Sequence, residues 1–166
     1  MAADVNQVVV GGYGTIGFRA VRLLAHGEVC QPLHGRSFNV RVTLSGDLGP
    51  TGRIIDFGSV AAALSAFCAG LEGRILVPLR NPAMEVWQDG DLWHIVHSTR
   101  RWTLPDCDVV ALDVVNPTNE MLAALCIGSL RRALHDNPEA GLLHRVEVAV
   151  GDPEGSAHRS EPWRQA

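Results

Sequence analysis

The sequence has no run of basic residues and little net charge of either sign. Its 14 basic residues stand against 18 acidic ones, which gives a formal net charge of −4 at pH 7. The densest basic stretches are the pairs Arg100–Arg101 and Arg131–Arg132. Proteins that follow a nucleic acid backbone need a contiguous cationic surface. We therefore expect no nucleic acid partner, whereas a local basic pocket is compatible with this pattern.

Long apolar stretches are also lacking, and the cysteines are few and scattered. The apolar runs fall short of the roughly 20 residues that span a membrane. Residues 1–4 do not lead from a charged segment into an apolar one, as a signal peptide does. Cys30, Cys68, Cys107 and Cys126 show no Cys-x-x-Cys spacing of a zinc knuckle or redox motif. We expect a cytoplasmic protein with reduced thiols and no membrane partner.

The composition that remains is typical of a globular protein. Hydrophobic residues make up 46% of the chain and charged residues 19%, which excludes the disordered class. A length of 166 residues suits a single core and leaves little room for a second. We predict one domain over residues 1–166.

Hydrophobic patterning predicts an α+β domain. Residues 34–45 alternate, with Phe38, Val40 and Val42 on one face, as in a strand. Helical spacing of apolar residues covers 59–71, and a second helix opens at 117–120 and continues to about His135. The other expected strands are 8–24 with a glycine bulge near Gly11–Gly12, a hairpin in 84–105 turning at Asp89–Gly90 with a third strand at 101–104, 108–115 and 144–150. This order indicates an antiparallel layout.

Two segments leave alternatives. Residues 12–17 match Gly-x-Gly-x-x-Gly, the turn that holds a dinucleotide pyrophosphate, after the apolar residues 8–10. That site calls for an acidic residue about 20 positions later. Residues 31–34 have none, so dinucleotide binding is the weaker interpretation. The polar tail from Gly151 is expected to be ordered only by a partner chain.

Four segments, in order, resemble the 6-pyruvoyl/6-carboxy-tetrahydropterin synthase family. Residues 30–42 resemble its Cys-x-x-Leu-His-Gly-His strand, residues 45–48 and 51–57 its next segments, and residues 116–123 its Pro-Thr-x-Glu-x-Leu-Ala helix start. The resemblance extends from Phe18 to Val150. It implies the tunnelling fold, an antiparallel sheet with two helices on one face, here with an inserted β-hairpin. It also implies a homo-oligomer whose sheets surround a channel, with small-molecule sites between subunits.

The residues that hold zinc in this family are largely replaced. The family uses one histidine on the first strand and both histidines of His-Gly-His. His34 matches the first of that pair and Arg36 the second, while the first-strand position falls on Arg22, or on Val21 with a slip of one residue. A guanidinium is always a donor and cannot coordinate a metal. We therefore expect no metal and no other cofactor.

The family's other catalytic positions are changed as well. Cys30 matches the catalytic cysteine, but Glu72–Gly73 replace the Asp-His pair after the first helix. The glutamate that anchors the pterin falls at Val150. Ordinary tetrahydropterin synthesis is therefore not expected.

Several residues remain candidates for the site, each with a structural alternative. Arg22 and Arg36 could replace the zinc charge and bind an anionic substrate, or they could form structural ion pairs. Cys30 and His34 could form a thiol–imidazole pair, or could be an ordinary half-buried cysteine and a histidine left without its metal. Glu72 is a candidate acid or base, or a solvated residue near a helix end.

The start of the second helix supplies the last candidates. By the resemblance, Thr118 and Glu120 border the substrate. An acidic residue in a first turn also stabilises the helix by itself, so capping is the alternative.

These residues lead to three functional hypotheses. The first is a metal-independent lyase, isomerase or cyclase that acts on a small carbonyl-bearing or anionic substrate. The second is a non-catalytic binding or assembly subunit of an active relative. The third is an active tetrahydropterin synthase with rearranged zinc ligands, which could include His26 or Glu28.

Overall fold

The computed structural model describes residues 6–12, 14–152 and 154–164. Residues 1–5, on which the expectation about a signal peptide rests, lie outside the described part, as does Tyr13 of the glycine motif. The helices are α1 (Phe57–Leu71) and α2 (Asn119–Ala133), with 3-10 turns η1 (Asp106–Asp108) and η2 (Pro138–Leu142). The strands are β1 (Asn6–Gly11), β2 (Gly17–Arg22), β3 (Ala25–His26), β4 (Val29–Cys30), β5 (Gly35–Gly46), β6 (Arg74–Pro78), β7 (Glu85–Asp89), β8 (Leu92–His97), β9 (Arg100–Pro105), β10 (Val109–Leu112), β11 (Leu143–Asp152) and β12 (Gly155–Pro162).

The main sheet is built around the long strand β5. Its strand order is β10-β6-β2-β5-β11-β12, and β1 also pairs with β5. The predicted antiparallel pairing holds except at β2–β6 and β6–β10, which are parallel. Strands β2 and β6 are parallel because both run opposite to β5. Strand β10 is parallel to β6 because the β7–β9 insertion returns the chain to the end of the sheet at which β6 begins. Strand β6 itself is not among the strands predicted from the sequence.

Where the sequence predicts one strand over 8–24 with a glycine bulge near Gly11–Gly12, the strand is interrupted, and two separate strands, β1 and β2, pair with β5. Gly11 pairs with Arg41 and Gly17 pairs with Asn39, so the two strands meet β5 on either side of Val40. Val40 accepts a hydrogen bond from the Gly12 N–H and donates one to the Ile16 carbonyl, both at 3.0 Å. A strand follows this glycine motif instead of a helix, so the dinucleotide interpretation is wrong.

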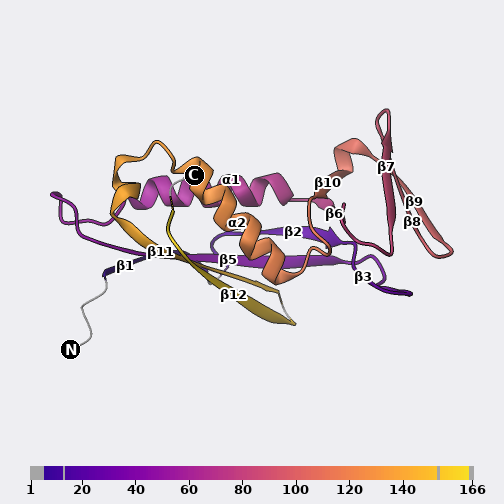
Figure 1. The fold of residues 1–166 in the computed structure, drawn as a ribbon, viewed down its shortest axis with the longest axis horizontal. Coiled ribbons are helices and arrows are strands. Elements are labelled where there is room, and N and C mark those ends of the chain that lie inside the picture. The colour runs from indigo at the N-terminus through magenta and orange to yellow at the C-terminus, as the bar shows by residue number, and fades with distance from the viewer. Residues whose placement is uncertain (1–5, 13, 153, 165–166) are drawn as a thin grey trace.

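Both helices cover the same face of the sheet (Figure 1). Asp56 caps α1, because its carboxylate accepts the Ser59 N–H at 2.8 Å. Thr118 caps α2 by accepting the Met121 N–H at 3.4 Å. The core between helices and sheet is aliphatic, and includes Val40, Val42, Leu44, Leu64, Leu122, Ile127, Val146 and Val148. No helix in the described residues is long and apolar enough to cross a membrane.

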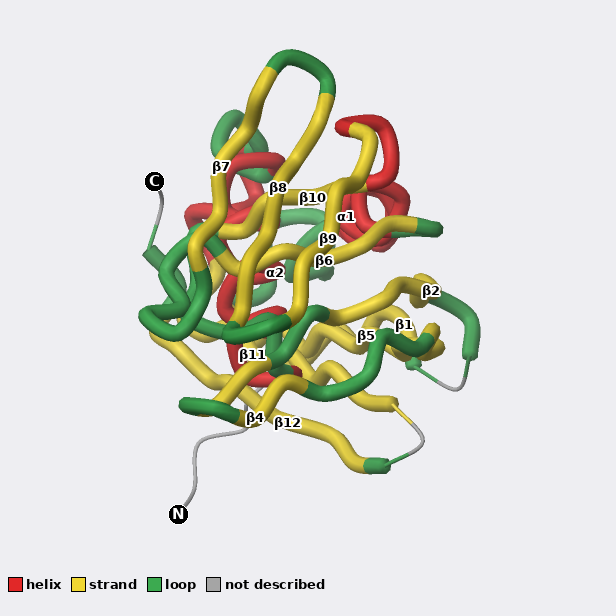
Figure 2. The backbone as a smooth tube through the Cα atoms, turned by 90° about the vertical axis from the view of Figure 1, so that its right-hand side faces the viewer, coloured by secondary structure: helices red, strands yellow, loops and turns green. Residues whose placement is uncertain are grey.

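The inserted hairpin forms a separate three-stranded sheet at one end of the molecule (Figures 1 and 2). Asp89 pairs with Leu92 across the predicted Asp-Gly turn, and β9 adds the expected third strand. One face of this sheet packs Ile95 against Leu23 and Val77. The buried His97 hydrogen-bonds the Gly27 carbonyl at 2.7 Å, which ties the insertion to the segment before Cys30.

The polar tail from Gly151, which we expected only a partner chain to order, joins the sheet of its own chain. Residues 155–162 form β12, which pairs with β11 in antiparallel register from Asp152–Gly155 to Arg145–Pro162. Strand β12 alternates polar residues with Ala157, Arg159 and Glu161 on its helix-facing side. Glu161 accepts from Arg131 of α2 at 2.9 Å and from Arg159 at 2.6 Å. Ion pairs therefore hold this strand where an apolar face would normally do so.

The close approach of β2 to β5 at Gly17 predicts that Gly17→Ala destabilises the protein. A Cβ at Gly17 would overlap the backbone carbonyl of Phe38 on β5, and a backbone neighbour cannot move aside cheaply. We expect a loss of about 1–3 kcal/mol in the free energy of unfolding, measured by denaturant titration. The control is Gly70→Ala in α1, where nothing lies within 4 Å of the added carbon. Gly70→Ala should be stabilising by about 0.5–1 kcal/mol. Equal effects of the two changes would show that the contact between Gly17 and Phe38 does not limit the side chain at this position.

Candidate functional site

Strands β2, β5 and β11 bring Arg22, Arg36 and Asp152 together at one end of the helix-covered face. Ala20 pairs with Arg36 across β2 and β5, so Arg22 lies one step further along the same face. The Arg22 guanidinium lies 5.1 Å from the centroid of the Phe38 ring, a cation–π distance. Of the two residues to which the resemblance assigns the first-strand ligand, Arg22 therefore lies beside Arg36, and Val21 points to the other face.

The two arginines share one carboxylate. Arg22 Nη2 lies 3.0 Å and Arg36 Nη1 3.6 Å from the same oxygen, Oδ2 of Asp152. The side chains of Arg22, Arg36 and Asp152 are only 9%, 10% and 3% exposed. Arg36 Nη2 also pairs with Oε1 of Glu154 at 2.7 Å, and this glutamate is 71% exposed. We call these four residues the arginine–carboxylate cluster.

Backbone and amide groups complete the cluster. The second oxygen of Asp152 accepts the N–H groups of Glu154 at 2.9 Å and Gly155 at 3.2 Å. Asn119 at the start of α2 accepts from Arg22 at 2.8 Å and donates to the Gly155 carbonyl at 3.2 Å. The cluster therefore connects β2, β5, the β11–β12 turn and α2.

The charges of the cluster shift one another's titration. Burial lowers the pKa of Arg22, and the Asp152 carboxylate opposes that shift. The hydrogen bond to Glu154 raises the pKa of Arg36. The same bond holds the pKa of Glu154 below its usual value, and His34 adds to that lowering. The hydrogen bond from Arg36 therefore favours the ionised form of Glu154, and His34 lies close enough to influence Glu154.

A cavity of about 350 Å³ adjoins the cluster at the N-terminus of α2. The predicted substrate-binding residues Arg22, Thr118 and Glu120 all line it, together with His26 and Gln31. Hydrogen bonds from its own backbone N–H and from the Thr118 hydroxyl lower the pKa of Glu120, with a smaller contribution from Arg22. Arg36 is joined to this cavity through Asp152 and Glu154, which are also in its wall.

The predicted catalytic residues do not meet in that cavity within one chain. The Cys30 thiol contacts the Gln31 carbonyl at 3.6 Å, while Nδ1 of the exposed His34 lies 2.8 Å from the Pro32 carbonyl. The hydrogen bonds between described residues include none from Cys30 to His34. Cys30 lines a different cavity of about 270 Å³, beside Arg100, whose guanidinium donates to the Cys30 carbonyl at 3.1 Å.

Glu72 lies at the C-terminal end of α1 and pairs with Arg19. Its carboxylate accepts the Arg19 backbone N–H at 2.7 Å and the Arg19 Nε at 3.0 Å. These bonds lower the pKa of Glu72. Glu72 lines a cavity with Ser65 and Cys68, separate from the one that Arg22 lines. Any catalytic role for Glu72 alongside Arg36 remains a prediction that this geometry does not support within one chain.

Sequence reasoning missed Asp152, Glu154 and Asn119. A signal for the first two is present in the segment 152–155, Asp-Pro-Glu-Gly, a turn sequence with proline at its second position. That turn directly follows the alternating strand 144–150 and predicts a hairpin. The partners of Arg22 and Arg36 lie on it.

These side chains do not fit a zinc ion of the family type. The three corresponding positions hold Arg22, His34 and Arg36, and both arginines are engaged with carboxylates. Among residues 6–12, 14–152 and 154–164, no group of three His, Cys, Asp or Glu side chains could hold a metal.

The cluster predicts a strong effect of Asp152→Asn. The change leaves two buried guanidiniums facing each other without their shared anion, and breaking a buried pair in this way costs about 3–5 kcal/mol. Glu154→Gln is the control, since Glu154 is exposed and an exposed ion pair contributes little. Denaturant unfolding of both variants tests the difference. An Asp152→Asn protein as stable as the wild type would show that the cluster does not stabilise the fold.

Comparison with known proteins places this geometry in a family. Residues 15–160 match the family model of 6-pyruvoyl tetrahydropterin synthase. A catalytic-residue mutant of that enzyme from Plasmodium vivax has a TM-score of 0.88 at 19% identity, covering 96% of this chain and 99% of that chain. The Plasmodium falciparum enzyme gives 0.87 at 17%, covering 95% and 98%. An uncharacterized Wolinella succinogenes protein gives 0.62 at 17%, with the same coverages. The fold is the expected tunnelling fold, and the chain belongs to the 6-pyruvoyl tetrahydropterin synthase family.

Proposed function

We propose that this chain is a zinc-independent member of its family that binds a small carbonyl-bearing or anionic substrate at Arg36. It acts on that substrate by acid–base chemistry, as a lyase, isomerase or cyclase. One observation carries the proposal: Arg36 is 10% exposed, yet its outer partner Glu154 is 71% exposed and lies on a turn. A buried cation is thus covered by a carboxylate that a ligand can replace.

Exchange of Glu154 for a substrate oxyanion is energetically feasible. An ion pair with one exposed member contributes little stability, so opening it costs little. The planar guanidinium of Arg36 can hold a carboxylate through two parallel hydrogen bonds. The same group can stabilise negative charge that develops on a carbonyl oxygen during enolisation or elimination. Asp152 stays between Arg22 and Arg36 during the exchange, and the incoming oxyanion supplies the second negative charge in place of Glu154.

Glu120 in the cavity wall and His34 near Glu154 supply the acid–base groups. Glu120 lines the cavity and is ionised at neutral pH, because its pKa is lowered, so it is suited to accept a proton. His34 lies within electrostatic range of Glu154 and is exposed, which suits proton exchange with solvent. We assign these roles to Glu120 and His34. Cys30 and Glu72 join the reaction only if a neighbouring subunit of a cytoplasmic homo-oligomer brings them to the cavity.

The second candidate function is a non-catalytic binding or assembly subunit that pairs with an active relative. Two observations favour it. Asp152 and Glu154 already balance both arginine charges. In addition, Cys30, His34 and Glu72 are not gathered around one cavity. An arginine–carboxylate cluster that only stabilises the sheet end is sufficient for this role.

The third candidate, a tetrahydropterin synthase with rearranged zinc ligands, has less support. His26 lines the cavity next to Arg22, but Glu28 lies in the separate cavity of Cys30. A zinc site built from them needs ligands from a second subunit.

Zinc content tests the metal-independent proposal. Protein purified without chelator should carry far less than one zinc per chain, measured by elemental analysis. Arg36→His should gain little or no zinc, because Arg22 still occupies the neighbouring ligand position. Near-stoichiometric zinc in the native protein would refute the proposal and favour the tetrahydropterin synthase with rearranged zinc ligands.

Ligand affinity tests the exchange at Arg36. In a screen of small keto acids, Arg36→Gln should weaken binding of any hit by at least about tenfold, since it removes a charge-assisted hydrogen bond pair. Glu154→Gln should tighten binding several-fold, because the competing carboxylate is gone. Arg80→Gln, which breaks the exposed Arg80–Asp113 pair, is the matched control and should change nothing.

The same screen separates enzyme from assembly subunit. Equal affinities of wild type and Arg36→Gln, or no hit at all, would contradict substrate binding at Arg36. Oligomerisation only in the presence of an active relative would then favour the assembly role.

A further inference from the structure

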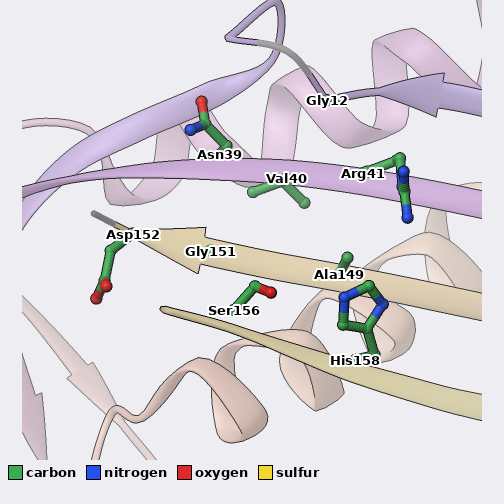
Figure 3. A pocket seen from close by; sticks show the side chains of 9 residues that line it. All are labelled: Gly12, Asn39, Val40, Arg41, Ala149, Gly151, Asp152, Ser156 and His158. Atoms are coloured by element: carbon green, nitrogen blue, oxygen red, sulfur yellow. The ribbon is translucent and has the colours of Figure 1, made fainter. Parts of the chain in front are cut away.

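The sheet face opposite the helices carries a second hollow, built by strand register. Ala149 on β11 pairs with Arg41 on β5 and with His158 on β12. Two residues along, Gly151 pairs with Asn39 and with Ser156. The central strand contributes Ala149 and Gly151 to the floor and Asp152 at one end, while both flanking strands contribute polar side chains (Figure 3). The result is a trough of about 310 Å³, which we call the β11 trough.

The polar walls of the β11 trough are rich in hydrogen-bond donors. Arg41 brings a permanent cation, and no described carboxylate lies within ion-pair distance of it. His158 faces it across Ala149, with Glu147 3.9 Å from its Nδ1. Asn39 and Ser156 add an amide and a hydroxyl in the next row. The Asp152 carboxylate, the one acid in the described lining, lies at the other end from Arg41 and is engaged by the arginine–carboxylate cluster (Figure 3).

Gly12 of the glycine motif lies close to the Arg41 side chain. Gly12, with φ +87°, donates its N–H to Val40 and places its backbone against the arginine stem. A Cβ at Gly12 would stand 3.2 Å from Cδ of Arg41. The absence of a side chain at Gly12 thus leaves room for the Arg41 stem at the edge of the trough.

We propose that the β11 trough is a second binding site, for the oxyanion group of a small molecule, either a carboxylate or a phosphate. Arg41 and His158 grip the anion from opposite walls, and the alanine and glycine floor leaves room for the rest of a flat molecule. A volume near 300 Å³ suits a ligand at the small end of those that proteins bind. Its cation Arg41 lies on the other face of the sheet from Arg36, although the two cavities share Asp152 and Ser156 in their walls. Variants of Arg41 therefore test this site separately from the proposed function.

Calorimetric titration with inorganic phosphate and with benzoate tests the site in the full chain. Saturable binding of either probe is expected, and the tighter one identifies a phosphate or a carboxylate ligand. Arg41→Gln should weaken it by at least about tenfold, as loss of a charged hydrogen-bond donor does. Ala149→Leu keeps every charge but fills the floor, and should abolish binding. Arg145→Gln is the matched control, because Arg145 is on the same strand face, two rows beyond Ala149, and bonds Ser160 at 2.9 Å.

Several outcomes overturn the proposal. Absence of saturable binding for both probes at millimolar concentration does so, as does equal weakening by Arg41→Gln and Arg145→Gln. Binding lost in Arg36→Gln but kept in Arg41→Gln assigns the anion to the other site and supports the proposed function alone. A change of oligomeric mass in Arg41→Gln without any anion binding shows that the trough is a contact between copies of the chain.

Discussion

The carboxylate of Asp152, shared between Arg22 and Arg36, is the constraint on which this end of the molecule depends. Two guanidiniums with about a tenth of their surface exposed cannot face each other without an anion between them. Two backbone N–H groups of the following turn hold that anion in place. The position of the β11–β12 turn, the start of α2 and the wall of the 350 Å³ cavity all follow from this contact.

Arginine is the side chain that this arrangement requires. All 14 basic residues of the chain are arginine. Arg22 bonds Asp152 through one terminal nitrogen and Asn119 through the other, while its plane lies near the Phe38 ring. A lysine ammonium is a compact point charge without a fork, so it could not divide itself between these partners. Among the described residues of the cluster, the Nε of Arg22 is a buried donor without a partner, because Asp152 and Asn119 fix the positions of the other two nitrogens.

Local features of the fold were predictable from the sequence, and non-local ones were not. The alternation of Phe38, Val40 and Val42 and the Asp89–Gly90 turn each act within a few residues, and both were predicted correctly. Arg22 and Asp152 are 130 positions apart, so no local pattern joins them. The resemblance pointed to Arg22 and Arg36 through the replaced zinc ligands, but it contained no information about the carboxylates that neutralise them.

Strands β6 and β12 were missed for different physical reasons. Residues 74–78 are a short apolar run, in which a buried strand cannot be told from a helix segment by periodicity. Strand β12 has no apolar face to detect, because Glu161 meets Arg131 and Arg159 where a valine or leucine would normally pack. The position of β12 is specified by charge complementarity between distant segments, such as Arg131 and Glu161, and this cannot be recognised from the sequence alone.

The two sites are linked by the pleat of β11 and β5. Consecutive residues on a strand face opposite sides of a sheet, so Gly151 is in the floor of the β11 trough while Asp152 enters the arginine–carboxylate cluster. On β5, Val40 packs into the core between Asn39 and Arg41, which face the trough. A one-residue slip of β11 would exchange the two sets, burying Glu147, Ala149 and Gly151 and exposing the valines. Because the cluster and the aliphatic core both resist that slip, the forces that neutralise Arg22 and Arg36 also keep Arg41 and His158 facing each other on the far side.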